Sequence, residues 1–131
     1  MILVDSSVWI DYFNGRGTPR TDRLDKLLGM EPLAIGDLIL TEVLQGFTAD
    51  ADYRQARQLL TSQTVFDMLG TELALKSADN YRTLRQRGIT VRKTIDTFIA
   101  TFCIERQHTL LFEDRDFLPF VEHLGLVAVD F

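Results

Sequence analysis

The sequence contains only one cysteine, Cys103, among its 131 residues. A single thiol cannot form an internal disulfide, and the apolar run FIATFCI around it predicts a small buried side chain rather than a catalytic thiol. No basic segment precedes an apolar run at the N-terminus, so we expect no signal peptide, and no uncharged apolar stretch is long enough to span a membrane. These absences favour a reducing, cytoplasmic setting without membrane attachment.

Positive charge is also scarce, with 14 lysines and arginines against 19 acidic residues and a net charge of −5. This balance argues against a nucleic-acid binder, because such proteins are usually basic. However, residues 81–95 contain no acidic residue, and eleven of the 14 cations of the chain are arginine, which binds phosphate with a planar fork. The cations of that stretch are Arg82, Arg85, Arg87, Arg92 and Lys93. The stretch is either a solvated helix face or a phosphate-binding surface.

The composition is otherwise that of an ordinary globular protein, with 46% hydrophobic and 25% charged residues, and we expect a single domain over residues 1–131. Short apolar runs alternate with segments of helical periodicity. The expected strands lie within residues 2–4, 31–36, 64–68, 108–114 and 126–131. The expected helices lie within residues 7–13, 21–28, 38–46, 49–62, 71–88, 94–107 and 116–125. This alternation predicts a three-layer α/β/α fold with a central, mainly parallel sheet.

Polar side chains at the starts of several expected helices are predicted N-caps. Thr21 or Asp22 would cap the second helix, Asp37 the third and Thr94 the helix over residues 94–107. The oxygen of such a side chain accepts a hydrogen bond from a backbone N–H that the helix itself leaves free.

Acidic residues follow two of the expected strands. Asp5 comes directly after the apolar run at residues 2–4, and Asp114 and Asp116 follow the strand that begins at residue 108. Functional sites of open α/β sheets form outside the carboxyl ends of the strands, so these acids are expected at one edge of the sheet.

Two further acids adjoin apolar segments. Glu42 lies within LILTEVL, and Asp96 lies at the start of TIDTFIATF. Taken alone, Glu42 could face solvent, and Asp96 could only stabilise the dipole of its helix. A cluster of Asp5, Glu42, Asp96 and Asp114 would be strongly repulsive without cations.

A cluster of carboxylates without histidine or cysteine suits a hard divalent ion, Mg²⁺ or Mn²⁺. His108 and His123 show no metal-ligand spacing and are read as surface residues, which argues against zinc. Mg²⁺ usually completes its coordination with water and substrate phosphate oxygens. This chemistry points to cleavage of phosphodiester bonds.

Four segments follow one another along the chain: ILVDSSVWIDYF, LILTEVLQGF, TIDTFIATFCIERQHTLLFEDRDF and the final strand. In these segments the sequence resembles the PIN-domain ribonucleases, and in particular the VapC-type toxins of bacterial and archaeal toxin–antitoxin pairs. Phe98 and Phe102 are a departure, because smaller residues are often found after the third acid of the family. They leave the acids themselves unchanged but could alter the packing or the dimer face.

The resemblance implies that Asp5, Glu42, Asp96 and Asp114 form an acidic catalytic site that holds a metal ion. Ser7 matches a hydroxyl position of the family, where it would orient Asp5 or hold a metal-bound water. A further member of the metal site is Asp116, for which N-cap of the following turn is the alternative.

The implied activity is Mg²⁺-dependent endonucleolytic cleavage of tRNA or rRNA, with Mn²⁺ as a substitute and Glu42 positioning the attacking water. Charge and position, rather than a family motif, make Arg85, Arg87, Arg92 and Lys93 the candidate phosphate contacts. The implied partners are a VapB-type antitoxin and a second copy of the chain.

The antitoxin contacts are also implied by the resemblance. Trp9, Phe13 and the loop 14–20 are candidates, with ordinary packing as the alternative.

Other classes fit less well. A receiver-like regulatory module would need a phosphoacceptor Asp ending a strand in mid-chain and a late Lys, but Asp67 is poorly placed and no Lys follows Lys93. A haloacid-dehalogenase-type phosphatase would need an acid where Ser7 stands. A catalytically silent PIN-like binding module would have the same fold, and only an assay of RNA cleavage distinguishes it from an active ribonuclease.

Overall fold

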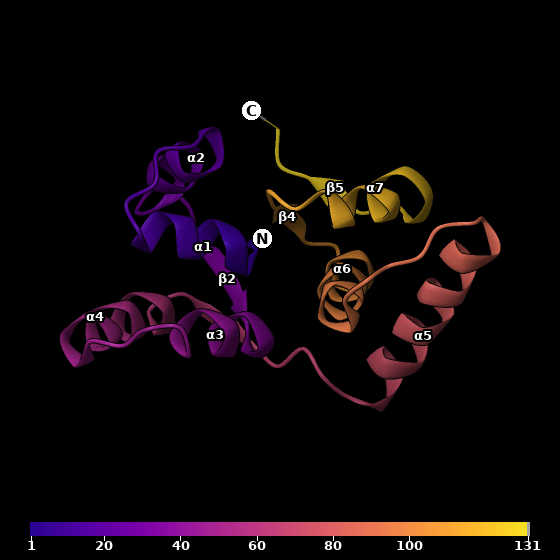
Figure 1. The fold of residues 1–131 in the computed structure, drawn as a ribbon, viewed down its shortest axis with the longest axis horizontal. Helices are drawn as coiled ribbons and strands as arrows, with labels where there is room; N and C mark the ends of the chain where they lie inside the picture. The colour runs from indigo at the N-terminus through magenta and orange to yellow at the C-terminus, as the bar shows by residue number, and fades with distance from the viewer. Residues whose placement is uncertain (131) are drawn as a thin grey trace.

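A computed structural model describes residues 1–130, and its centre is a five-stranded sheet in which every pairing is parallel (Figure 1). The strands are β1 (Ile2–Val4), β2 (Leu33–Gly36), β3 (Thr64–Phe66), β4 (Thr109–Leu111) and β5 (Val127–Ala128). Their order in the sheet is β3-β2-β1-β4-β5. The short apolar runs of the sequence become these strands because parallel strands covered on both faces must be apolar throughout.

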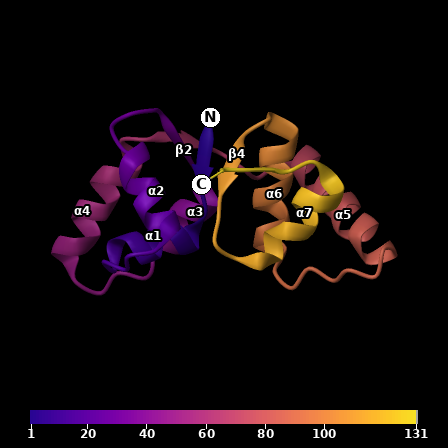
Figure 2. The ribbon, with the colours of Figure 1, turned by 90° about the horizontal axis from the view of Figure 1, so that it is seen from above.

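The helices form two layers around the sheet. They are α1 (Ser6–Phe13), α2 (Pro19–Leu27), α3 (Asp37–Leu44), α4 (Asp50–Thr61), α5 (Thr71–Gln86), α6 (Thr94–Arg106) and α7 (Leu118–Leu124), with a 3₁₀ turn η1 (Arg115–Phe117) before α7. Figure 2 shows α1 to α4 on one side of the strands and α5 to α7 on the other. The predicted α/β/α architecture is therefore confirmed.

The strand order explains why the helices change sides. From β1 the chain steps outward to β2 and β3, then returns across the sheet to β4, on the other side of β1, and steps outward again to β5. Right-handed crossovers place the helices of the first half on one face and those of the second half on the opposite face. The direction reverses between β1 and β4, and such a switch point is where open α/β sheets bind ligands.

The same order excludes the receiver-like alternative. Receivers have the flavodoxin-type order, in which the second strand lies at the edge of the sheet. Here β2 lies between β1 and β3, with Ile2 opposite Leu33 and Ala34 opposite Thr64.

Several helices begin earlier than the sequence predicted. The N-cap of α2 is Thr18, which exchanges hydrogen bonds with Thr21 in a capping box, so neither Thr21 nor Asp22 is the cap. The structure also makes Asp37 the first residue of α3 rather than its cap, and the Asp37 carboxylate accepts from Met68 N at 3.0 Å. The N-cap of α6 is Lys93, and Thr94, which was expected to be the cap, is the first residue of the helix. A pattern of apolar residues does not reveal these ends, because α2 begins at a side-chain capping box whereas the caps of α3 and α6 make no side-chain hydrogen bond.

The core lies between the sheet and its two helix layers. Trp9, Leu110 and Phe117 are fully buried there. The thiol of Cys103 is buried as predicted, and burial raises its pKa to about 12, which makes it a poor nucleophile at neutral pH. Among residues 1–130, no helix combines the length and apolarity needed to cross a bilayer.

Candidate active site

Asp5 stands at the switch point between β1 and β4. Its backbone N–H donates to the carbonyl of Leu111 at 2.9 Å, which holds the ends of the two strands together. Its carboxylate caps α1 by accepting from the backbone N–H of Ser7 at 3.4 Å and from the Ser7 hydroxyl at 2.9 Å. Asp5 is only 5% exposed. Ser7 thus contacts Asp5 directly, and its role in orienting Asp5 or a metal-bound water stays a prediction.

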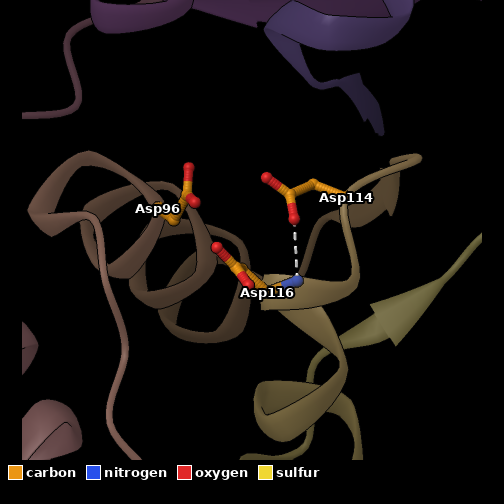
Figure 3. Close-up of side chains that lie close together, drawn as sticks. All are labelled: Asp96, Asp114 and Asp116. Atoms are coloured by element: carbon orange, nitrogen blue, oxygen red, sulfur yellow. Dashed lines mark hydrogen bonds between the residues drawn. The ribbon is translucent and has the colours of Figure 1, made fainter.

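Three aspartates gather beside this point (Figure 3). Asp96 lies in the first turn of α6, Asp114 follows β4, and Asp116 lies in η1. Each offers a carboxylate oxygen, and these oxygens all lie within 4.8 Å of one another. We call Asp96, Asp114 and Asp116 the carboxylate cluster. The structure therefore brings together Asp96 with Asp114 and Asp116, which lie in a separate part of the chain.

Local hydrogen bonding fixes the turn that carries two of these acids. Asp114 Oδ1 accepts a hydrogen bond from the backbone N–H of Asp116 at 2.9 Å, which makes Asp114 the N-cap of η1. The alternative in which Asp116 is the N-cap is therefore wrong. Capping leaves the second oxygen of Asp114 and both oxygens of Asp116 for other partners.

Glu42 reaches the same region from α3. Its Oε1 accepts a hydrogen bond from the hydroxyl of Ser6 at 2.7 Å, and its charge contributes to raising the pKa of Asp5. Within residues 1–130, neither Asp5 nor Glu42 belongs to the group of three carboxylates whose oxygens are mutually close. The predicted site thus divides into the carboxylate cluster and a neighbouring pair, Asp5 and Glu42.

Ser6 is a site residue that the sequence analysis did not single out. It is 7% exposed and hydrogen-bonds Glu42, whereas its neighbour Ser7 bonds Asp5. The signal was present in the two consecutive hydroxyls after Asp5. The partner of each became visible only once α1 and α3 were packed together.

The electrostatic environment of the acids is strongly unfavourable to charge. Burial is the main cause that raises the pKa of Asp96 to about 7, and the charge of Asp5 adds to it, while Lys93 opposes the shift. Burial also raises the pKa of Asp5. Within the described part of the chain, Asp96 Oδ2 is buried without any hydrogen-bond partner. A buried carboxylate oxygen in this state lacks a cation or a donor.

The donor set fits a hard divalent ion. All the available ligand atoms are carboxylate oxygens, which suit Mg²⁺ or Mn²⁺ and not the nitrogen and sulfur sites of zinc. Asp96, Asp114 and Asp116 would hold the ion. Neutralising the repulsion among these acids is the electrostatic gain from binding.

The predicted phosphate contacts fall into two groups. Arg92 and Lys93 face the carboxylate cluster, with Arg92 Nη2 at 3.1 Å from Asp116 Oδ2 and Lys93 Nζ at 3.6 Å from Asp114 Oδ2. The contacts of the other two are elsewhere: Arg85 lies over the ring of Tyr81, and Arg87 contacts His123 in α7.

The two histidines are not equivalent. The ring of His108 lies 5.2 Å from that of Phe66 and 5.4 Å from that of Phe102, and burial lowers its pKa. His108 is therefore a partly covered residue rather than a fully exposed one, whereas His123 is exposed as expected. Across residues 1–130 neither belongs to a group that could hold a metal ion.

The raised pKa of Asp96 predicts how stability depends on pH in the presence of EDTA. The folded protein holds this proton more tightly than the unfolded chain, whose carboxyl has a pKa near 3.8. The resulting contribution to stability is full below the unfolded pKa and is lost as the pH rises through about 7. Urea unfolding at about pH 5.5 and about pH 8.5 should therefore show a larger loss of stability with rising pH in the wild type than in Asp96→Asn. Equal losses would contradict the assignment.

Comparison with known proteins agrees with this architecture. The family model of the PIN domain matches residues 2–120. The chain therefore belongs to the PIN domain family. Its curated relatives are VapC ribonucleases, among them Ribonuclease VapC11 of Mycobacterium tuberculosis, which is 31% identical over 136 residues, an alignment covering 100% of this chain and 99% of that protein.

Solved structures share the fold. VapBC2 of Rickettsia felis, bound to a DNA fragment from its promoter, has a TM-score of 0.75 at 17% identity, covering 100% of this chain and 99% of the other. VapBC-1 of nontypeable Haemophilus influenzae has a TM-score of 0.73 at 20% identity, with coverage of 99% and 98%.

Proposed function

We propose that this protein is a Mg²⁺-dependent endoribonuclease, the toxin of a VapBC-type pair, and that it cleaves tRNA or rRNA. The observation that carries the proposal is the carboxylate cluster beside the switch point of a PIN domain, in which Asp96 also has a buried oxygen without a partner. The VapC ribonuclease names of its relatives support the reaction class.

Each acid has a distinct part in this proposal. Asp96, Asp114 and Asp116 would hold the metal ion, which lowers the pKa of a bound water and stabilises charge on the phosphate oxygens. Glu42, with one oxygen held by Ser6, would accept the proton of the attacking water through its other oxygen. Asp5, oriented by Ser7, would add negative charge beside the carboxylate cluster and so favour the binding of cations there. Arg85, Arg87, Arg92 and Lys93 would contact phosphates along the RNA.

A cognate antitoxin and a second copy of the chain are the proposed protein partners. The similar solved structures include VapBC assemblies and a toxin–antitoxin complex from Klebsiella pneumoniae, which supports an antitoxin for this chain as well. Trp9 is fully buried and cannot be a direct contact, so packing is its role. Phe13 and Phe47 line a hollow beside α1 together with Ile10 and Val43, where apolar antitoxin side chains would fit. A cellular RNA substrate would place the action of the protein in the cytoplasm.

The direct test is cleavage of total cellular RNA by the purified protein, followed by sequencing of the new RNA ends. We expect discrete cuts in tRNA or rRNA with Mg²⁺ or Mn²⁺ and none with EDTA. Cleavage that persists in EDTA would overturn the metal-dependent mechanism. A complete lack of cleavage with either ion would favour a catalytically silent binding module.

Removing the hydroxyl of Ser6 tests the role of Glu42. The Ser6→Ala variant should cleave RNA about tenfold more slowly, because partners that orient the groups of a metal site are typically worth about 10–100-fold. Ser62→Ala is the matched control, since its hydroxyl bonds only near neighbours in the chain, the Leu59 carbonyl and the Gln63 side chain, at an exposed helix end. Single-turnover rates measured at saturating Mg²⁺ provide the comparison. An unchanged rate in Ser6→Ala would remove Ser6 from the site.

A further inference from the structure

The loop between α5 and α6 directs two cations at the carboxylate cluster. Arg92 Nη2 lies 3.2 Å and 3.1 Å from the two carboxylate oxygens of Asp116. Lys93 Nζ lies 3.6 Å from Asp114 Oδ2, and its charge also acts on Asp96. Two of the three carboxylates are thus paired with cations of the chain itself, and Asp96 retains an oxygen without a partner.

These contacts compete with metal coordination. A carboxylate oxygen that accepts from a guanidinium or an ammonium offers less of its lone-pair density to a metal ion. A divalent ion among the same oxygens would also repel both side chains at close range. An ion bound by these oxygens would therefore weaken the pairs with Arg92 and Lys93.

The side chains of Arg92 and Lys93 can move away from the carboxylate cluster because they are largely exposed to solvent. The side chain of Arg92 is 75% exposed and that of Lys93 is 62% exposed, whereas those of Asp116 and Asp114 are only 19% and 27% exposed. Ion pairs with such exposed cations contribute little to stability and exchange readily with water. Release of Arg92 and Lys93 would consequently leave the turn that carries the acids in place.

We propose that Arg92 and Lys93 are resident counter-ions of the carboxylate cluster, and that a divalent ion displaces them and frees them for the phosphates of a nucleic acid. The phosphate half of this proposal rests on the proposed ribonuclease function. Metal and nucleic acid then bind cooperatively, and linkage requires the coupling to be reciprocal.

Metal binding alone tests the first half. In calorimetric titrations with Mn²⁺ and without RNA, the Arg92→Gln/Lys93→Gln variant should bind the ion about tenfold more tightly than wild type, because two repelling charges are gone. Arg85→Gln/Arg87→Gln is the control, since it makes the same change in net charge at side chains that contact Tyr81 and His123 instead. Unchanged or weaker binding in the first variant, or an equal gain in the control, would overturn the proposal.

The second half is tested by binding of a fluorescent DNA oligonucleotide, which carries the same phosphates without the ribose hydroxyl. Adding Mn²⁺ should steepen the slope of log K against log salt by about 1.4 in wild type, about 0.7 for each freed cation on a single strand. The Arg92→Gln/Lys93→Gln variant should show no such change. An equal change in both proteins would refute the displacement. If both binding experiments give the expected results but the protein does not cleave RNA, only the ribonuclease proposal is refuted.

Discussion

Replacement of Asp96 by asparagine is expected to abolish RNA cleavage while the protein stays folded. Asparagine keeps the shape of the side chain but removes the charge of the most buried member of the carboxylate cluster, whose Oδ2 has no partner within residues 1–130. Loss of an outer partner of a metal site typically costs about 10–100-fold, so loss of a ligand should cost at least about 100-fold in single-turnover rate and in Mn²⁺ affinity.

Two measurements keep this prediction separate from a folding defect. Asp79→Asn, at an exposed position on α5, makes the same chemical change away from the cluster and should cleave RNA at the wild-type rate. In EDTA at about pH 8, Asp96→Asn should be at least as resistant to urea as wild type, because a buried unpaired charge is no longer required. Full cleavage by a folded Asp96→Asn protein would refute the metal site.

Among the proposed substitutions, replacement of Phe117 by alanine should lower the free energy of unfolding the most. Phe117 ends η1 and is fully buried, with its ring centroid 5.2 Å from that of Phe112. Truncation of a buried Phe leaves a cavity and typically costs about 3–5 kcal/mol. The free energy of unfolding from urea titrations should fall by this amount.

The adjacent residue supplies the control for that experiment. Leu118 is 41% exposed, and Leu118→Ala should lower the free energy of unfolding by no more than about 0.5 kcal/mol. The Phe117→Ala protein should also bind Mn²⁺ more weakly, because Asp116 directly precedes the lost anchor. A loss below about 1 kcal/mol would show that η1 is held by its capping hydrogen bond instead of by the packing of Phe117.

The sequence was sufficient to predict the order of elements and the location of the acids. Apolar runs that stop at Asp5 and before Asp114 can be recognised locally, and the rule for parallel sheets places their ends at one edge. The position of Asp96 at the start of an apolar helix also allowed a dipole-stabilising role, and the resemblance to PIN-domain ribonucleases assigned it to the acidic site. None of these inferences required knowing how two side chains meet.

Contacts between side chains were not predictable in the same way. That Ser6 rather than Ser7 bonds Glu42 depends on how α1 lies against α3. That Arg92 and Lys93 turn toward the acids depends on the path of a loop, and the sequence suggested phosphates as their partners. Interactions of this kind are set by packing and loop geometry, which hydrophobic periodicity does not encode.

The central position of β1 has a consequence for the newly made chain. Ile2 pairs with both Leu33 and Thr109, so β1 has both of its neighbours only after β4 has been synthesised. Asp5 and Asp114 therefore come together by a long-range closure of the chain. A nascent chain that ends before β4 consequently lacks the assembled carboxylates.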